Sequence, residues 1–303
     1  MVLLYLSTQE RAEVWQKLFA DADEEIVIGE AAVVDHDAIT HLACWKPPAD
    51  IGRYRNLRVV ISVGAGVDQV PPLPEGVNLS RTLSPRIDQM VCEWVVMSAL
   101  MLHRNMVTYI DQASRGIWKP HANLMTRETR IGVMGMGRVG LPVARCLKNM
   151  GFHVSGFSRS GRPNDGITTY GARDMDVFLA DTNLLICLLP LTDDTRGLMS
   201  DAFFNKLPMG SRLVHAGRGA QIDMTALRSA LDQGRIESAM LDVTNPEPLP
   251  ENHWAWADPR IIITPHIASV TDYEDGARHV LEVIDADRNG RIIPGLVDST
   301  LGY

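Results

Sequence analysis

Several features are scarce in this sequence of 303 residues, and each scarcity excludes a class of protein. The four cysteines are widely spaced and form no CxxC pair, so the sequence indicates neither a disulfide framework nor a metal site. Lys and Arg number 29 against 37 Asp and Glu, which leaves no broad basic surface for nucleic acid or an anionic membrane. No apolar run approaches the roughly 18 residues that a membrane-spanning helix needs.

The cysteines and the first residues both favour a location in the cytoplasm. Each cysteine lies within an apolar run, where a free thiol behaves as a small hydrophobic group, so buried thiols are expected. The opening MVLLYLSTQE is apolar but short and has no basic residues before it, so we expect a core strand rather than a signal peptide. The cysteines are Cys44, Cys92, Cys146 and Cys187.

What the sequence does contain is an alternation of short apolar strands with helical stretches. With 46% hydrophobic residues, the chain can bury a large core and form more than one domain. The alternation predicts a parallel sheet with helices on both faces. In the first part of the chain the expected elements are strands Val2–Leu6, Glu25–Gly29, His41–Trp45 and Val59–Val63, and a helix from Arg11 to Phe19.

A second α/β series begins at Thr129, and a helical pattern from Thr271 to Asn289 then returns to the first domain. The expected fold class is therefore α/β, with two Rossmann-like doubly wound parallel-sheet domains, of which the first is discontinuous. We expect one domain at 1–101 with 270–303 and another at 102–269. The second series comprises strands Arg130–Gly135, Phe152–Phe157, Leu184–Leu189, Leu213–His215, Ser238–Asp242 and Ile261–Thr264, and a helix from Val139 to Met150.

The region between the two series predicts a buried helix followed by an arm. From Arg86 to about Arg104 the helical pattern is apolar on more than half of its circumference, as in core helices and subunit contacts. The next stretch, ASRGIWKPHANLMTRETR, lacks apolar periodicity, and we expect an arm over 106–127. The methionine-rich helix and the arm together predict a homodimer.

A glycine turn opens the second domain in the context of a dinucleotide site. Gly135, Gly137 and Gly140 in IGVMGMGRVG follow an apolar strand and open a helix. The first glycine allows a tight turn, the second lets backbone approach a pyrophosphate, and the third lets helix and strand pack closely. The helix N-terminus adds N–H donors and partial positive charge. We expect Met136, Arg138 and Val139 to contribute to the same site.

The residues after the next strand favour a phosphorylated ribose. An NAD site usually has Asp or Glu there, about twenty residues after the glycines, to bind the ribose hydroxyls. Here VSGFSRSGR has no carboxylate, and Arg159 can pair with a 2′-phosphate. NADP(H) is therefore the preferred cofactor, with NAD(H) possible; the alternative is that these arginines are ordinary solvated charges. The residues concerned are Ser158, Arg159, Ser160 and Arg162.

Several ordered motifs in the second domain carry a family resemblance. They are LLPLTDDTRGLM, GRGAQIDMTAL, LDVTNPEPLP and ITPHIAS, with SVGAGVDQV as a looser match in the first domain. The chain resembles the D-isomer-specific 2-hydroxyacid dehydrogenases, and within them the glyoxylate/hydroxypyruvate reductase A type. The resemblance implies a flavodoxin-like substrate domain, an NAD(P)-binding domain, and reduction of a small 2-keto acid: glyoxylate to glycolate and hydroxypyruvate to D-glycerate.

The resemblance also assigns catalytic roles, and the chemistry of each side chain suits its role. The family's arginine falls on Arg218, its acid on Glu247 and its proton donor on His266, while Asp242 matches the aspartate that holds the nicotinamide amide. A guanidinium clamps a carboxylate bidentately. An imidazole transfers a proton near neutral pH, and a carboxylate orients the imidazole.

Further contacts follow from the same motifs. The cofactor contacts implied are Leu189, Pro190, Thr195, Ala216, Gly217, Asp242 and His266. The substrate contacts implied are Trp45, Val63, Gly64, Ala65, Trp118, Arg218, His266 and Ser269. Trp45 would narrow the pocket, or alternatively serve as a core or interface residue, and Trp118 would reach a neighbouring subunit. His215 and Ala216 depart from the pattern, since many relatives carry asparagine or other small polar residues there.

Two rival hypotheses stay open at this point. One is a reductase for a bulkier, phenylpyruvate-like 2-keto acid. The other is a catalytically silent dinucleotide sensor or corepressor. Such a protein would have no use for Arg218, Glu247 and His266 together.

Overall fold

The computed structural model describes residues 1–164 and 166–298, which form two compact units. The first unit is discontinuous and combines Met1–Ile87 with the described residues from Val270 on, and the second is Asp88–Ser269. The division falls inside helix α2 (Pro85–His103), whereas the sequence placed it at the end of this helix, near residue 101.

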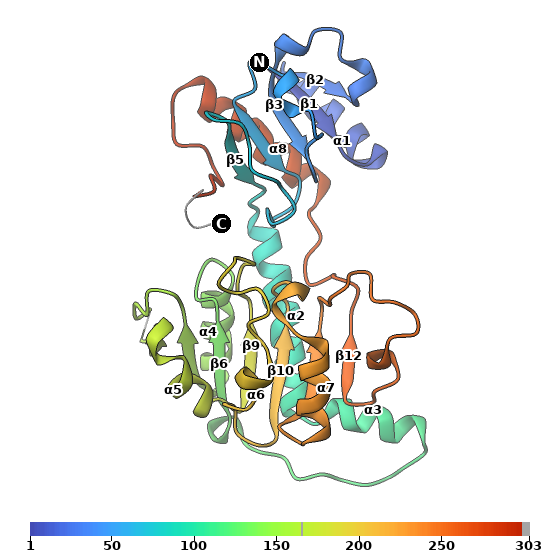
Figure 1. The fold of residues 1–303 in the computed structure, drawn as a ribbon, viewed down its shortest axis with the longest axis vertical. Helices are drawn as coiled ribbons and strands as arrows, with labels where there is room; N and C mark the ends of the chain where they lie inside the picture. The colour runs from blue at the N-terminus through green and yellow to red at the C-terminus, as the bar shows by residue number, and fades with distance from the viewer. Residues whose placement is uncertain (165, 299–303) are drawn as a thin grey trace. The chain divides into compact units, whose positions relative to one another are not determined.

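In the first unit, five described strands form one parallel sheet in the order β2-β1-β3-β4-β5 (Figure 1). This is the flavodoxin-like order. The direction in which successive strands are added across the sheet reverses between β1 and β3. Helices α1 and α8 pack against each other over one face of this sheet. The elements are β1 Val2–Leu6, α1 Gln9–Asp21, β2 Glu25–Ile28, β3 Ile39–Cys44, β4 Val59–Ser62, β5 Asn78–Arg81 and α8 Tyr273–Arg288.

Trp15 on α1 joins the two ends of this discontinuous unit. Its ring is fully buried and packs against Tyr5 and Phe19, while Nε1 donates a hydrogen bond to the Tyr273 carbonyl at 2.9 Å. The apolar core therefore supports the expectation, based on pattern alone, that the helix after residue 270 packs with the first strands. The opposite face is covered by shorter segments around Tyr54 and Leu57 rather than by a long helix.

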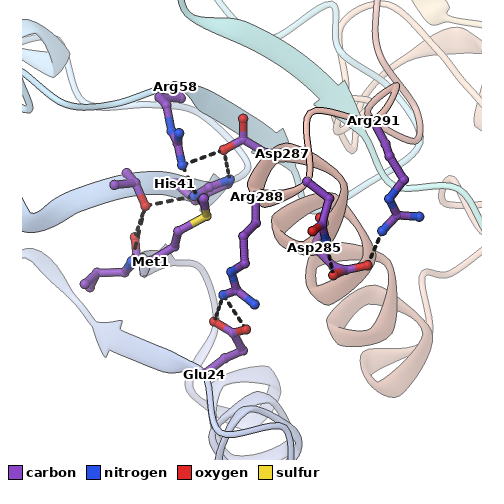
Figure 2. A network of polar contacts seen from close by, with 11 residues as sticks. Met1, Glu24, His41, Arg58, Asp285, Asp287, Arg288 and Arg291 are labelled. Atoms are coloured by element: carbon purple, nitrogen blue, oxygen red, sulfur yellow. Dashed lines mark hydrogen bonds and ion pairs between the residues drawn. The ribbon is translucent and has the colours of Figure 1, made fainter.

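A polar network lies where β3 meets α8 (Figure 2). His41 on β3 is fully buried, and its Nε2 lies 3.2 Å from Asp287 Oδ2 on α8. Arg58 reaches the same carboxylate at 2.8 Å. Burial is the main cause that lowers the pKa of His41 to about 4, and the nearby Asp287 carboxylate only partly opposes it.

The second unit contains a parallel sheet of seven described strands in the order β12-β11-β10-β9-β6-β7-β8. Counted from β6, this is the Rossmann order extended by one strand, with its switch point between β6 and β9. The expected fold class is confirmed. The elements are α3 Met106–Ser114, β6 Arg130–Met134, α4 Gly140–Asn149, β7 His153–Phe157, β8 Thr169–Tyr170, α5 Met175–Ala180, β9 Leu184–Cys187, α6 Asp201–Phe204, β10 Ser211–His215, α7 Met224–Asp232, β11 Ile236–Leu241 and β12 Ile261–Ile263.

Two local expectations need correction. The segment expected as an arm begins with helix α3, because Val107 is buried while exposed Met106 and Ile110 occupy its other side. Cys92 and Cys146 are only partly buried, unlike Cys44 and Cys187.

None of the helices in the described ranges is long and apolar enough to cross a membrane.

Candidate functional site

Most of the predicted site residues of the second unit follow the carboxyl ends of its parallel strands. Arg218 comes after β10, Glu247 after β11 and His266 after β12, and these three strands are neighbours in the sheet. The glycine turn follows β6, and the arginine-containing loop follows β7. Since the carboxyl edge of an open α/β sheet is where ligands bind, the topology gathers these side chains at one edge.

His266 and Glu247 form a hydrogen-bonded pair. The distance from His266 Nδ1 to Glu247 Oε1 is 2.5 Å, and both side chains are about two-fifths exposed, at 39% and 42%. The carboxylate can only accept, so Nδ1 carries the proton of this bond and the other ring nitrogen, Nε2, remains for a ligand. His266 also has a left-handed backbone, with φ of 53°. Such a conformation in a non-glycine residue persists when its surroundings hold it in place.

Asp242 supplies that support from the end of β11. Its carboxylate accepts hydrogen bonds from Thr264 Oγ1 at 2.6 Å and from the backbone N–H groups of Ile267 and Ala268, each at 2.8 Å. The His266 N–H also donates to the Asp242 carbonyl at 2.9 Å. Asp242 is only 2% exposed, so these bonds fix the loop that carries the histidine.

The turn that carries Arg218 lies against the segment that carries Glu247. A Cβ added to Gly219 would lie 1.7 Å from the Thr244 carbonyl oxygen, so only glycine permits this approach. The guanidinium of Arg218 donates from Nη1 to the Gly217 carbonyl at 2.9 Å. Three segments distant in sequence are thus brought together by direct backbone packing and hydrogen bonds.

The glycine turn has the geometry that a bound pyrophosphate requires. Gly135 has φ of 99°, and a Cβ on Gly140 would lie 1.8 Å from the Gly135 carbonyl oxygen. At Gly137 an added Cβ would meet no atom within 4 Å, so open space lies beside the backbone there. Helix α4 begins at Gly140 and directs its N-terminal N–H groups toward this turn. These residues fit a dinucleotide phosphate group.

The loop after β7 presents polar groups to solvent. Arg159, Ser160 and Arg162 are exposed and Ser158 is partly buried. The hydroxyls of Ser158 and Ser160 accept hydrogen bonds from the N–H groups of Gly161 and Arg162, at 3.2 and 3.4 Å. The segment VSGFSRSGR that forms the start of this loop contains no Asp or Glu.

The loop after β9 is held by its own hydroxyl groups. Thr195 Oγ1 donates to the Pro190 carbonyl at 2.8 Å and accepts from Thr192 N–H at the same distance. These bonds give Leu189 and Pro190 a defined conformation. The loop also lies beside the turn at Ala216 and Gly217, since a Cβ on Gly217 would lie 3.0 Å from the Leu189 carbonyl oxygen.

In the first unit the predicted substrate residues also gather at a carboxyl edge. Trp45 follows β3 and Val63 follows its neighbour β4. A Cβ on Gly64 would lie 3.0 Å from the Trp45 ring, so the indole packs directly on the glycine loop. Ser62 Oγ donates to the Gly66 carbonyl at 2.7 Å and thereby closes this loop around Ala65. Trp45 is 51% exposed, which excludes a role as a core residue within this unit.

The other predicted substrate residues lie in the second unit. Trp118 is fully exposed in the coil after α3, and Ser269 is partly buried after the histidine loop. Among the described residues no group of three or more His, Cys, Asp or Glu side chains is placed to hold a metal ion. Sequence reasoning missed Thr264 and Gln221, whose side chains bind Asp242 and the arginine turn, because neither belongs to an acid–base or anion-binding residue type.

Comparison with known proteins shows similarity to NAD(P)-dependent dehydrogenases and reductases. Residues 96–268 match the family model for the D-isomer specific 2-hydroxyacid dehydrogenase, NAD binding domain. A glyoxylate/hydroxypyruvate reductase A from Salmonella paratyphi B is 30% identical over 312 residues, covering 100% of both chains.

Two solved structures are similar over nearly their whole length. A D-isomer specific 2-hydroxyacid dehydrogenase from Xanthobacter autotrophicus, in complex with NADPH and MES, has a TM-score of 0.94 and 31% identity, covering 100% of this chain and 99% of that one. An NADPH-dependent glyoxylate/hydroxypyruvate reductase from Sinorhizobium meliloti, in complex with NADP and sulfate, has a TM-score of 0.90 and 33% identity with the same coverage.

Proposed function

The chain belongs to the D-isomer specific 2-hydroxyacid dehydrogenase family, and from this premise we propose that it reduces small 2-keto acids such as glyoxylate and hydroxypyruvate, with NADPH as the preferred reductant. The observation that carries the proposal is the hydrogen-bonded His266–Glu247 pair, set beside the Arg218 turn at one sheet edge. This arrangement provides a proton donor and a carboxylate clamp.

We assign to each residue the role that the family resemblance implies and that its chemistry allows. Arg218 binds the carboxylate of the 2-keto acid and stabilises negative charge on its 2-oxygen. Glu247 holds Nδ1 of His266, and Nε2 gives its proton to the 2-oxygen as C2 is reduced. When bound, the reduced nicotinamide supplies the hydride, and that chemistry belongs to the cofactor. Glu247 then stabilises the ring in the orientation needed to regain a proton from solvent.

Support for NADPH comes from the loop after β7 and from the relatives. Arg159 and Arg162 are exposed in this loop, the segment VSGFSRSGR contains no Asp or Glu, and both solved relatives named above contain NADP or NADPH. A 2′-phosphate would pair with the arginines, whereas a carboxylate would repel it. Arg159→Asp is expected to reverse the ratio of kcat/KM for NADPH over NADH. An unchanged ratio would contradict the role of Arg159.

The named relatives favour a small substrate over the two rival hypotheses. Trp45 packs on Gly64 and fills space beside the Val63, Gly64 and Ala65 loop, whose residues the resemblance implies as substrate contacts. We therefore expect glyoxylate and hydroxypyruvate to exceed phenylpyruvate in kcat/KM, and Trp45→Ala to narrow that difference. A panel of 2-keto acids at fixed NADPH measures both ratios.

A homodimer is part of the proposal. Large apolar side chains are exposed along α2, α3 and the coil that follows, as expected for a surface that a second copy covers. Trp118, fully exposed on this stretch, is then available to a neighbouring subunit's site. The exposed apolar residues are Met97, Met106, Ile110, Ile117, Trp118, Leu124 and Met125. Light scattering should give a mass of twice the 33.5 kDa of one chain.

The cytoplasmic location of the protein stays a prediction.

The primary test is loss of NADPH absorbance at 340 nm on addition of glyoxylate or hydroxypyruvate. His266→Ala is the control and should lower kcat by about 10²- to 10⁴-fold, the usual contribution of a general acid. Absence of turnover with every 2-keto acid, together with normal NADPH binding, would instead favour the dinucleotide sensor.

A further inference from the structure

Gln221 is a fully buried amide that joins the Arg218 turn to the loop after β9. Its Oε1 accepts a hydrogen bond from the Arg218 backbone N–H at 2.8 Å. Its Nε2 donates to the carbonyls of Leu189 and Pro190, at 3.1 and 2.9 Å. All of these groups belong to the second unit, and both hydrogens of the amide are used.

No other side chain of similar size makes the same set of bonds. A carboxylate has no hydrogen to give to the two carbonyls, and a methionine offers neither a strong donor nor a strong acceptor. There is also no spare space, because a Cβ on Gly217 would lie 2.4 Å from the Gln221 oxygen. The amide is therefore both chemically and sterically matched to this turn.

His215 holds the other end of the same turn. Its ring is fully buried, and Nε2 donates to the Arg218 carbonyl at 3.0 Å, since a carbonyl can only accept. The Arg218 peptide groups are thus fixed on both sides, by Gln221 at the N–H and by His215 at the carbonyl. The turn itself has only the short 3-10 segment Gly219–Gln221 after it, so these side chains replace the support of a helix.

We propose that Gln221 is a positioning residue for Arg218: it ties the arginine turn to Leu189 and Pro190, so that the guanidinium keeps the orientation in which it clamps the substrate. This inference rests on the proposed function, because it assigns a purpose to Gln221 only if Arg218 binds a 2-keto acid. It goes beyond the motifs, which assign no role to either Gln221 or His215.

The first measurement compares wild type with Gln221→Met, which has a similar length but cannot make the three bonds. We expect kcat/KM for glyoxylate to fall about 10- to 100-fold, because small misplacements of a binding group have effects of this size. We expect the NADPH dissociation constant, from fluorescence titration, to change less than about threefold. A larger rise in that constant with an unchanged kcat/KM at saturating NADPH would overturn the proposal, since Gln221 would then serve the cofactor loop.

A double-mutant cycle separates positioning from general destabilisation. If Gln221 acts through Arg218, Gln221→Met should lower kcat/KM less than about twofold in an Arg218→Ala background. An equal loss in both backgrounds would overturn the role.

Gln221→Glu is the second variant should Gln221→Met fail to fold. It keeps the acceptor for the Arg218 N–H group, and protonation of the new carboxyl restores one donor. Its activity relative to wild type should therefore rise as the pH falls, and a constant ratio would count against the proposal.

The two proposals fail in different ways. A wild-type protein that turns over no 2-keto acid overturns the proposed function and this inference with it. An active wild type with unaltered kinetics in Gln221→Met overturns only the role of Gln221.

Discussion

At the scale of single residues, the site depends on backbone conformations that few residue types tolerate. His266 has a left-handed backbone, and Gly140 and Gly219 lie where a Cβ would overlap a carbonyl oxygen. Gly137 differs from them, since its surroundings are open. Gly140 is therefore needed for folding, whereas the open space at Gly137 supports the proposal that this glycine lets a ligand approach the backbone.

That difference predicts opposite effects of two alanine substitutions. Gly140→Ala should lower the free energy of unfolding by about 1–3 kcal/mol, because the new methyl group must displace the Gly135 carbonyl. Gly137→Ala should leave the urea midpoint nearly unchanged but weaken NADPH binding, because the methyl group projects into the space proposed for the pyrophosphate. Equal loss of stability in the two variants would contradict this assignment.

A further residue-scale prediction concerns Glu247. Glu247→Gln keeps the size of the side chain but removes the charge that accepts the His266 Nδ1 hydrogen, and its amide can instead present hydrogens to the ring. The wrong ring tautomer or orientation should lower kcat by about 10²- to 10⁴-fold with little change in NADPH binding. Steady-state kinetics at saturating NADPH test this, and a kcat within twofold of wild type would exclude Glu247 from the proton transfer.

At the scale of elements, the sequence predicted what depends on periodicity and motif, and missed what depends on local packing. Ten strands and four helices follow apolar patterns, so their existence was predicted from the sequence, and they are β1–β4, β6, β7, β9–β12, α1, α2, α4 and α8. Strand β5 has the polar sequence NLSR and β8 only two residues, and neither carries a periodic signal. The Gln221 bonds span 31 and 32 residues to chain positions with no shared motif, so no spacing could reveal them.

The loop between β12 and α8 offers a test at this scale. Asp242→Asn should lower the free energy of unfolding by about 1–3 kcal/mol, because the amide can no longer accept from Thr264 and both N–H groups at once. Thr264→Val is the matched control that removes only one of the three bonds, so its effect should be smaller. Urea unfolding measures the free energy of unfolding of both variants. A greater loss of that free energy in Thr264→Val than in Asp242→Asn would show that Asp242 does not organise the loop.

At the scale of the whole molecule, each unit combines an apolar core with a fully buried histidine, His41 in the first and His215 in the second. His41 lies beside Asp287 in the first unit (Figure 2), and His215 supports the Arg218 turn in the second. Burial, the largest cause in each case, lowers the pKa of both rings from the usual 6.5 to about 4. Both units therefore contain a ring that is neutral when folded and gains a proton more readily when unfolded.

This arrangement predicts that acid destabilises both units over a defined pH range. Above pH 6.5 the histidines are neutral in both states and their contribution to stability is fully present. As the pH falls from 6.5 toward 4, only the unfolded chain binds the extra protons, so each ring lowers the free energy of unfolding by up to about 1.4 kcal/mol per pH unit. Urea unfolding at pH 7.5, 6.5, 5.5 and 4.5 measures the slope. His41→Gln should remove about half of the slope that the two rings contribute, and a stability independent of pH across this range would refute the assignment.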